Sequence, residues 1–241
     1  ADLARARAAD VLAAWSGLGY YRRARSLHAA AREVVREHGG RVPDDPAAFG
    51  RLPGVGRYTA AAVLSIAYGR PLPALDGNAA RVLSRLEALP ASIREPAGAR
   101  RLWARAAALV PARRSGDWNQ ALMELGSTIC TPRAPRCPAC PLRRHGRALA
   151  LGRVDRLPPP AARRAGERVP MVYALIVRAG RVLMTQREGP LLAGLWEPPG
   201  IEADDEEAAG ALRRRLVELG LRVRLVPTGR IVRHSITHRR I

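Results

Sequence analysis

The spacing of apolar residues divides the chain into a helical part and a part with short strands. In residues 1–150 apolar side chains recur every three or four positions, which is the spacing of an amphipathic helix. This pattern predicts helices over residues 58–68 and 77–89, and it predicts no strand in this half. Further helices are predicted from residue 11 and over residues 22–38, 102–110 and 119–130.

The pattern changes after a segment rich in Pro and Arg, residues 151–168, which is predicted to be a linker. Residues 169–177 and 181–185 are β-branched runs around Ala179-Gly180, which indicates a hairpin. A helix over residues 206–219 and a strand over residues 222–226 are predicted to follow. The predicted domains are therefore a helical one over residues 1–150 and an α/β module over residues 169–241.

Composition adds a class of partner to this picture. The chain has 241 residues and a formal net charge of +20, from 41 basic and 21 acidic residues, which favours a nucleic acid over a merely basic surface. All 41 basic residues are Arg, which indicates a compositional bias of the source genome. Such a bias does not by itself explain why basic residues outnumber acidic residues. Without a signal segment or a run of eighteen apolar residues, we expect a soluble cytoplasmic protein that does not bind membranes.

Two motifs at a fixed distance carry the candidate chemistry. Residues 52–60 read Leu-Pro-Gly-Val-Gly-Arg-Tyr-Thr-Ala, and residues 76–78 read Asp-Gly-Asn. The first has the form of a glycine hairpin that opens a helix, whose free N–H groups and positive dipole end suit a phosphate. Taken singly, each motif also has a plain interpretation, because Gly-x-Gly turns are common loops and Asp76 could be only a helix cap.

Together the two motifs resemble the helix-hairpin-helix superfamily of DNA glycosylases, and specifically the MutY-type adenine DNA glycosylases. This resemblance implies a mainly α helix-hairpin-helix glycosylase domain that breaks an N-glycosidic bond through a cationic transition state on the sugar. It implies that Asp76 stabilises the cation and activates water, and that Asn78 bonds the reacting groups. Tyr58 occupies the position of a lysine nucleophile in lyase-competent relatives, so a monofunctional glycosylase is implied. Gln120 is assigned a lesser role near the site.

The resemblance also implies the contacts with DNA. Residues 15–25 resemble a wedge loop, in which Tyr20 would insert beside the target base and hold the kinked duplex open. A plain alternative is that Tyr20 and Tyr21 are ordinary core aromatics. In the hairpin, the residues expected to contact DNA are Leu52, Gly54, Val55, Gly56, Arg57 and Thr59.

Three cysteines lie within eleven positions, which favours a metal over disulfides in an intracellular chain. Cys130, Cys137 and Cys140 match the first three ligands of the [4Fe-4S] cluster loop of the resembled family. The fourth Cys is expected at residue 146, where this chain has Gly146, preceded by His145. We expect an iron–sulfur cluster, with four alternatives left open: His145 as fourth ligand, a labile three-cysteine cluster, a zinc site, or no cluster.

The C-terminal module resembles a partial α/β Nudix (MutT-like) domain. Residues 194–200 look like the entry to that fold, but the following helix lacks most carboxylates that would hold Mg²⁺. The resemblance instead implies the domain that reads 8-oxoguanine opposite the target adenine. Ile236, Thr237 and His238 take the places of the reading loop, with a polar strand of chance composition as the alternative.

The resemblance covers nearly the whole chain, but the family's glycosylase domain begins before residue 1 with helices that carry a general-acid Glu, and the C-terminal module stops early. We therefore expect a nucleoid-associated, monomeric base-excision-repair enzyme for 8-oxoguanine:adenine or G:A mispairs in double-stranded DNA. This segment is expected to be impaired. The alternatives are a non-catalytic lesion-binding remnant and, less favoured, a nucleotide pyrophosphohydrolase.

Overall fold

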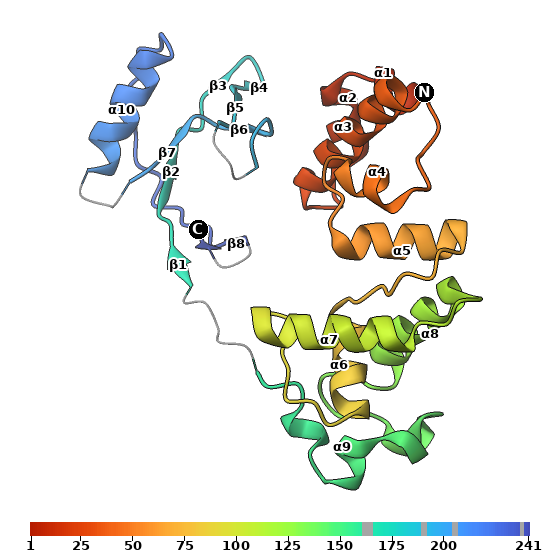
Figure 1. The fold of residues 1–241 in the computed structure, drawn as a ribbon. Coiled ribbons are helices and arrows are strands. Elements are labelled where there is room, and N and C mark those ends of the chain that lie inside the picture. The colour runs from red at the N-terminus through yellow and green to blue at the C-terminus, as the bar shows by residue number, and fades with distance from the viewer. Residues whose placement is uncertain (161–165, 189–191, 204–206, 237–238) are drawn as a thin grey trace. The chain divides into compact units, whose positions relative to one another are not determined.

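The computed structural model describes all residues except 161–165, 189–191, 204–206 and 237–238, and it divides into two units (Figure 1). The first unit spans Ala1–Ala162 and the second spans Arg163–Ile241. Within the described residues, no helix is both long and apolar enough to span a bilayer.

The first unit is helical throughout its described part, as the apolar spacing predicts. Its helices are α1 (Asp2–Arg5), α2 (Ala8–Ala14), α3 (Tyr21–Glu37), α4 (Pro46–Arg51), α5 (Arg57–Tyr68), α6 (Gly77–Leu86), α7 (Pro96–Leu109), α8 (Ser115–Thr128) and α9 (Arg147–Ala150). Three 3-10 turns, η1 (Cys137–Ala139), η2 (Arg143–His145) and η3 (Val154–Arg156), lie in the segments around α9.

Two apolar clusters hold these helices together. One joins α3, α4 and α5 through Val34, Phe49, Leu52 and Leu64. The other surrounds α6, which contacts α7, α8 and α9 (Figure 1). Its buried members are Leu75, Ala79, Ala80, Val82, Leu83, Ala91, Leu102, Ala106 and Leu122. The segment that carries Asp76 therefore connects the two clusters.

The turn between α4 and α5 is fixed by backbone geometry and by its packing on α3. Asp45 caps α4 by accepting a hydrogen bond from the N–H of Ala48 at 2.8 Å. Gly54 has φ of +77°, and a Cβ added there would lie 2.3 Å from the Cβ of Ser26 in α3. Both the left-handed backbone and the close approach therefore require glycine at this position.

In its described residues, the second unit consists of short paired strands, antiparallel except for one pair, and one helix. The strands are β1 (Glu167–Arg168), β2 (Met171–Tyr173), β3 (Val177–Arg178), β4 (Arg181–Val182), β5 (Thr185–Gln186), β6 (Trp196–Glu197), β7 (Gly200–Glu202), β8 (Ser235–Ile236) and β9 (Arg239–Arg240), and the helix is α10 (Ala208–Glu218). β2 pairs with β7, β3 with β4, and β5 with β6, while β1 is parallel to β9, which pairs with β8.

The core of the second unit lies between α10 and the β2–β7 pair, where Leu212 and Leu216 pack near Ala174. The predicted turn at Ala179-Gly180 is confirmed as the β3–β4 connection, with both residues at positive φ. The predicted strand over residues 222–226 is wrong, because this described segment has no regular secondary structure. Val223 and Val226 are exposed, and a β-branched run forms a strand only where a partner strand pairs with it.

Candidate active site

Asp76 begins α6 and uses its two carboxylate oxygens differently. Oδ1 accepts a hydrogen bond from the N–H of Ala79 at 2.7 Å, which is an N-cap. Oδ2 accepts a hydrogen bond from Nδ2 of Asn78 at 3.1 Å. The capping role and a chemical role are therefore compatible, since the cap occupies only one oxygen and also fixes the orientation of the carboxylate.

Tyr58 reaches the same site from the first turn of α5. Its hydroxyl donates to the Sδ of Met123 in α8 at 3.3 Å. Burial raises the pKa of Tyr58, and the negative charge of Asp76 raises it further. The phenol therefore stays neutral at ordinary pH, and the two predicted residues act on each other electrostatically.

Arg81 connects the Asp76–Asn78 pair to α8 and to the first cysteine. Its Nη2 donates to Oδ1 of Asn78 at 2.9 Å and to the carbonyl of Gly126 at 2.7 Å. Its Nε donates to the carbonyl of Cys130 at 2.8 Å. Burial, more than any other cause, lowers the pKa of Arg81. No sequence signal indicates this role, because one helical arginine among many has no distinctive spacing.

Asn119 fixes the chain just before Asp76 and is almost fully buried, with 1% of its surface exposed. Its Nδ2 donates to Oγ of Ser65 and to the carbonyl of Leu72, both at 2.8 Å. Its Oδ1 accepts from the N–H of Ala74 at 3.0 Å. The predicted residue Gln120 is instead exposed and donates to the carbonyl of Gly116 in its own helix at 3.2 Å.

A signal for Asn119 does exist in the sequence. Residues Ser115, Asn119, Leu122 and Gly126 are all buried and follow a helical spacing on one face of α8. A polar amide on a buried face needs partners, so its position predicts an internal hydrogen-bonded residue.

The hairpin residues divide into those that face solvent and those that support the turn. Gly54, Gly56 and Thr59 are exposed, and the first N–H groups of α5 have no acceptor within the helix. The side chain of Leu52 is buried in the α3–α5 cluster, and Val55 packs against the same cluster. These two side chains therefore shape the turn rather than present themselves to a ligand.

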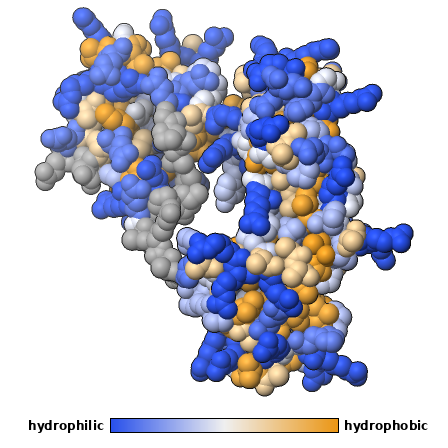
Figure 2. All heavy atoms as spheres, in the orientation of Figure 1, coloured by the Kyte–Doolittle hydropathy of each residue, from blue (hydrophilic) through white to orange (hydrophobic). Residues whose placement is uncertain are grey.

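The arginine of the hairpin motif has a defined position. The guanidinium of Arg57 lies 4.0 Å from the ring centroid of Trp103 in α7, a cation–π contact. On the face of the molecule that Figure 2 shows, many hydrophilic side chains project, with apolar atoms between them. The first turn of α5 is thus bordered by a positive group held at a fixed place.

Tyr20 stands out of the surface on strained backbone. It has φ of +48°, unusual for a residue with a Cβ, and 71% of its surface is exposed. Nε1 of Trp15 donates to the carbonyl of Gly19 at 2.9 Å and so anchors the preceding turn. Tyr21 is half-buried and begins α3. Tyr20 is therefore held outward and is not a core aromatic.

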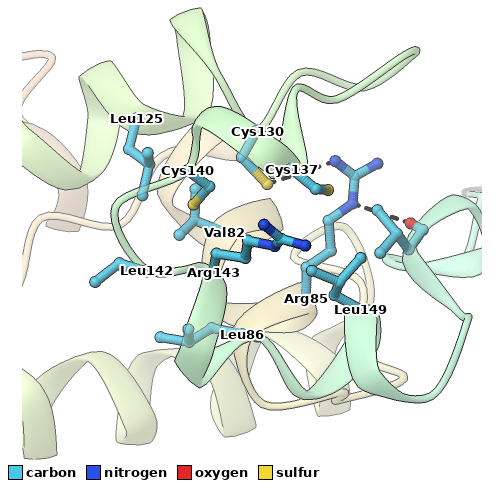
Figure 3. A pocket seen from close by; sticks show the side chains of 12 residues that line it. Val82, Arg85, Leu86, Leu125, Cys130, Cys137, Cys140, Leu142, Arg143 and Leu149 are labelled. Carbon is cyan, nitrogen blue, oxygen red and sulfur yellow. Dashed lines mark hydrogen bonds between the residues drawn. The ribbon is translucent and has the colours of Figure 1, made fainter.

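The three cysteines line one pocket of about 50 Å³ beside α6 (Figure 3). Gly146 belongs to the lining, whereas His145 is exposed and does not belong to it. Over the described residues, no three His, Cys, Asp or Glu side chains form a ready-made metal site. A [4Fe-4S] cluster normally takes four thiolates, and the three cysteines supply three of them.

Arg85 enters this pocket from α6 and holds the cysteine loop (Figure 3). Its Nη1 donates to the carbonyl of Thr131 at 2.7 Å and lies 3.5 Å from Sγ of Cys130. Its Nε donates to the carbonyls of Val154 at 3.0 Å and Leu157 at 2.8 Å. Part of the segment predicted as linker is therefore bonded to α6.

Only part of the predicted reading loop can be located. Ile236 lies in β8, where its backbone pairs with Arg239. Thr237 and His238 lie outside the described residues. In α10 the acid is Glu218 at the last position, where it pairs with Arg215 at 3.3 Å, so this helix presents no cluster of carboxylates for a magnesium ion.

Comparison with known proteins assigns both units to families. Residues 1–107 match the HhH-GPD superfamily of base excision DNA repair proteins, and residues 172–241 match the NUDIX domain. The adenine DNA glycosylase of Arabidopsis thaliana is 39% identical over 223 residues, covering 86% of this chain and 35% of the relative. This chain spans half or less of the length of the curated relatives it matches.

Solved structures agree with the helical fold. A thermostable thymine-DNA glycosylase matches with a TM-score of 0.56 and 31% identity, over 62% of this chain and 69% of that one. A trapped endonuclease III–DNA covalent intermediate matches with a TM-score of 0.52 and 27% identity, over 61% of this chain and 67% of that one.

Proposed function

Because this chain belongs to the HhH-GPD superfamily of base excision DNA repair proteins, as a MutY-type member, we propose that it removes adenine mispaired with 8-oxoguanine or guanine from double-stranded DNA. The observation that carries the proposal is the Asp76–Asn78 pair at the start of α6, with Tyr58 beside it. The endonuclease III neighbour is a complex with DNA, which supports DNA as the partner.

Asp76 performs the central step of the proposed reaction. As the bond between adenine and the sugar breaks, positive charge develops on the sugar, and the Asp76 carboxylate stabilises it and activates the attacking water. The N–H of Ala79 and Nδ2 of Asn78 hold the carboxylate in one orientation before the substrate arrives. Arg81 in turn holds Asn78, so the geometry does not have to be organised during the reaction.

Tyr58 limits the chemistry to hydrolysis. A Schiff base requires an amine, and a neutral phenol bonded to Met123 cannot form one. The product of the proposed reaction is therefore an abasic site in an intact strand.

The remaining predicted residues serve to hold the duplex. The exposed turn at Gly54–Gly56 and the first N–H groups of α5 bind a backbone phosphate, and Arg57 adds charge beside them. Tyr20 fills the space left when adenine is rotated out of the stack. In the second unit, Ile236, Thr237 and His238 read the base opposite adenine. The net charge of +20 makes all of this binding weaker as salt rises.

Protonation of the leaving adenine requires an acid besides Asp76. In the described part of the chain, no second carboxylate is hydrogen-bonded to the Asp76–Asn78–Arg81 group. We therefore expect residues 1–241 by themselves to bind lesion DNA and to release adenine slowly. The alternative function, lesion binding without chemistry, is an outcome of the same experiment.

The test measures binding and base release on one set of duplexes. Residues 1–241 are mixed in excess with duplexes that contain 8-oxoguanine:adenine, G:A or T:A, and gel shifts are compared with alkali-cleaved product over hours. Asp76→Asn keeps the helix cap but removes the charge, so release should fall at least about 100-fold. Asp45→Asn makes the same change at the cap of α4 and should leave release unchanged.

Each outcome decides between the two functions. Preferential binding with slow release that depends on Asp76 supports the glycosylase. Preferential binding with no release supports the lesion-binding alternative. Equal binding to mispaired and ordinary duplexes contradicts both, and fast release contradicts the expected impairment.

A further inference from the structure

Arg57 differs from exposed arginines such as Arg36 in the kind of partner that it has. Arg36 pairs with the carboxylate of Glu37 at 2.6 Å. In the part of the chain that the structure describes, the guanidinium of Arg57 lies instead over the ring of Trp103 and forms no hydrogen bond or ion pair. The side chain is therefore held in place while its N–H donors stay free for a ligand.

Trp103 can hold this arginine because its own ring is fixed. It lies in α7, is half-buried, and packs against the buried cluster around α6. The guanidinium carbon of Arg57 lies 4.0 Å from the ring centroid, which is a close cation–π contact. An arginine stacked on a ring presents the edge of its plane, where the N–H groups are, away from that ring.

The contact also joins the two halves of the first unit. Arg57 begins α5, which belongs to the apolar cluster with α3 and α4. Trp103 packs against the other cluster, which surrounds the helix that Asp76 caps. A phosphate bound to Arg57 is therefore tied, through Trp103, to the half of the unit that contains the Asp76 carboxylate.

We propose that Trp103 is a positioning residue for DNA binding, which holds the guanidinium of Arg57 where its free N–H groups bind one backbone phosphate of the duplex. The inference rests on the proposed function only in that DNA is the ligand. Trp103 acts through Arg57 and not through a contact of its own with DNA. A long side chain loses conformational freedom when it binds, and Arg57 loses less because the ring already holds it.

A double-mutant cycle on DNA affinity tests this role. The full chain is titrated into fluorescein-labelled 8-oxoguanine:adenine and T:A duplexes, and fluorescence anisotropy gives Kd at several salt concentrations. Arg57→Gln should raise Kd about tenfold and reduce the slope of log Kd against log salt by about 1, because one phosphate contact is lost.

Trp103→Leu should have a smaller effect of a different kind. It should raise Kd about threefold and keep the slope of the parent chain, because the charge of Arg57 remains but is no longer held. The variant that carries both substitutions should bind as Arg57→Gln alone does, because the ring has no effect on DNA once the guanidinium is gone.

Matched variants separate positioning from packing. Trp103→Phe keeps a ring beside Arg57 and should stay within about twofold of the parent Kd. Trp118→Leu makes the same change at another half-buried tryptophan, in α8, and should leave Kd unchanged. Arg36→Gln removes an equal charge from an arginine that already has a carboxylate partner, and should leave the salt slope unchanged. Circular dichroism verifies that the helices persist in every variant.

Four results would overturn the proposal. If Trp103→Leu raises Kd by the same factor with and without Arg57→Gln, the ring acts through the packing of α7. If Trp103→Leu binds as tightly as the parent, Arg57 needs no support. If Arg57→Gln leaves the salt slope unchanged, the guanidinium contacts no phosphate. These three results leave the proposed function intact, whereas a parent chain that binds neither duplex contradicts both.

Discussion

Removal of the Asn119 side chain should loosen the segment that leads to Asp76. Asn119→Ala deletes three hydrogen bonds, and it leaves the carbonyl of Leu72 and the N–H of Ala74 without their partner. A buried polar group left unpaired costs about 1–3 kcal/mol. Two such backbone groups lose their partner, and the structure around Asn119, which is only 1% exposed, can relax only in part. We therefore expect the first unit to lose about 2–4 kcal/mol of stability.

The assay must isolate the first unit, because a chain of two units does not unfold in one step. Hydrogen exchange with mass spectrometry over residues 69–76 reports on the loosened segment directly. Tryptophan fluorescence during urea unfolding gives the stability, with Trp196→Phe in all samples to silence the second unit. The matched control is Gln120→Ala, because the exposed Gln120 side chain donates to a carbonyl of its own helix; this substitution should lower the stability by less than about 0.5 kcal/mol.

The reasoning would be refuted if Asn119→Ala and Gln120→Ala had equal effects on stability. It would also be refuted if exchange over residues 69–76 stayed as slow as in the parent chain. Either result would mean that Leu72 and Ala74 are held in place by their packing and not by the amide of Asn119.

Three further outcomes are expected. Gly54→Ala should lower the urea midpoint strongly, because its Cβ meets Ser26 at 2.3 Å, whereas Gly56→Ala, which has open space around it, should lower only DNA affinity; equal midpoints would contradict this. Burial and the charge of Asp76 raise the pKa of Tyr58 above its unfolded value of 10.0, so stability that is present below that pH is lost as the pH rises past it; the free energy of unfolding of Tyr58→Phe should therefore fall less with rising pH above 10.0 than that of the parent chain, and an unchanged profile would argue against it. Tyr20→Ala should keep stability but reduce the fluorescence rise of 2-aminopurine opposite 8-oxoguanine, and an undiminished rise would count against the wedge.

The sequence was sufficient for features that depend on neighbouring residues. The helical spacing predicts α5 and α6, and the hairpin and Asp-Gly-Asn motifs identify the residues around Asp76, because each of these signals is contained within a short stretch of neighbouring residues. The turn at Ala179-Gly180 is likewise a local signal.

The features that the sequence did not reveal depend on partners far along the chain. Arg81 bonds a carbonyl 49 positions away, and Arg85 bonds one 72 positions away. Their acceptors are backbone carbonyls, which every residue has, so no residue type marks them. The prediction of a strand over residues 222–226 is wrong for a related reason. A strand forms only when another strand pairs with it, and the residues of this segment do not reveal whether such a partner exists.

The double use of Asp76 separates folding from chemistry in this chain. Asn, Ser and Thr also cap helices well, so several single substitutions at this position preserve α6 and the core around it. Only a carboxylate performs the proposed reaction. A gene that acquires one of these substitutions would still yield a folded protein that, under the proposed function, binds its lesion without excising the base. Cellular abundance is therefore no guide to repair capacity here, and an inert protein of this kind would shield the mispair from other enzymes.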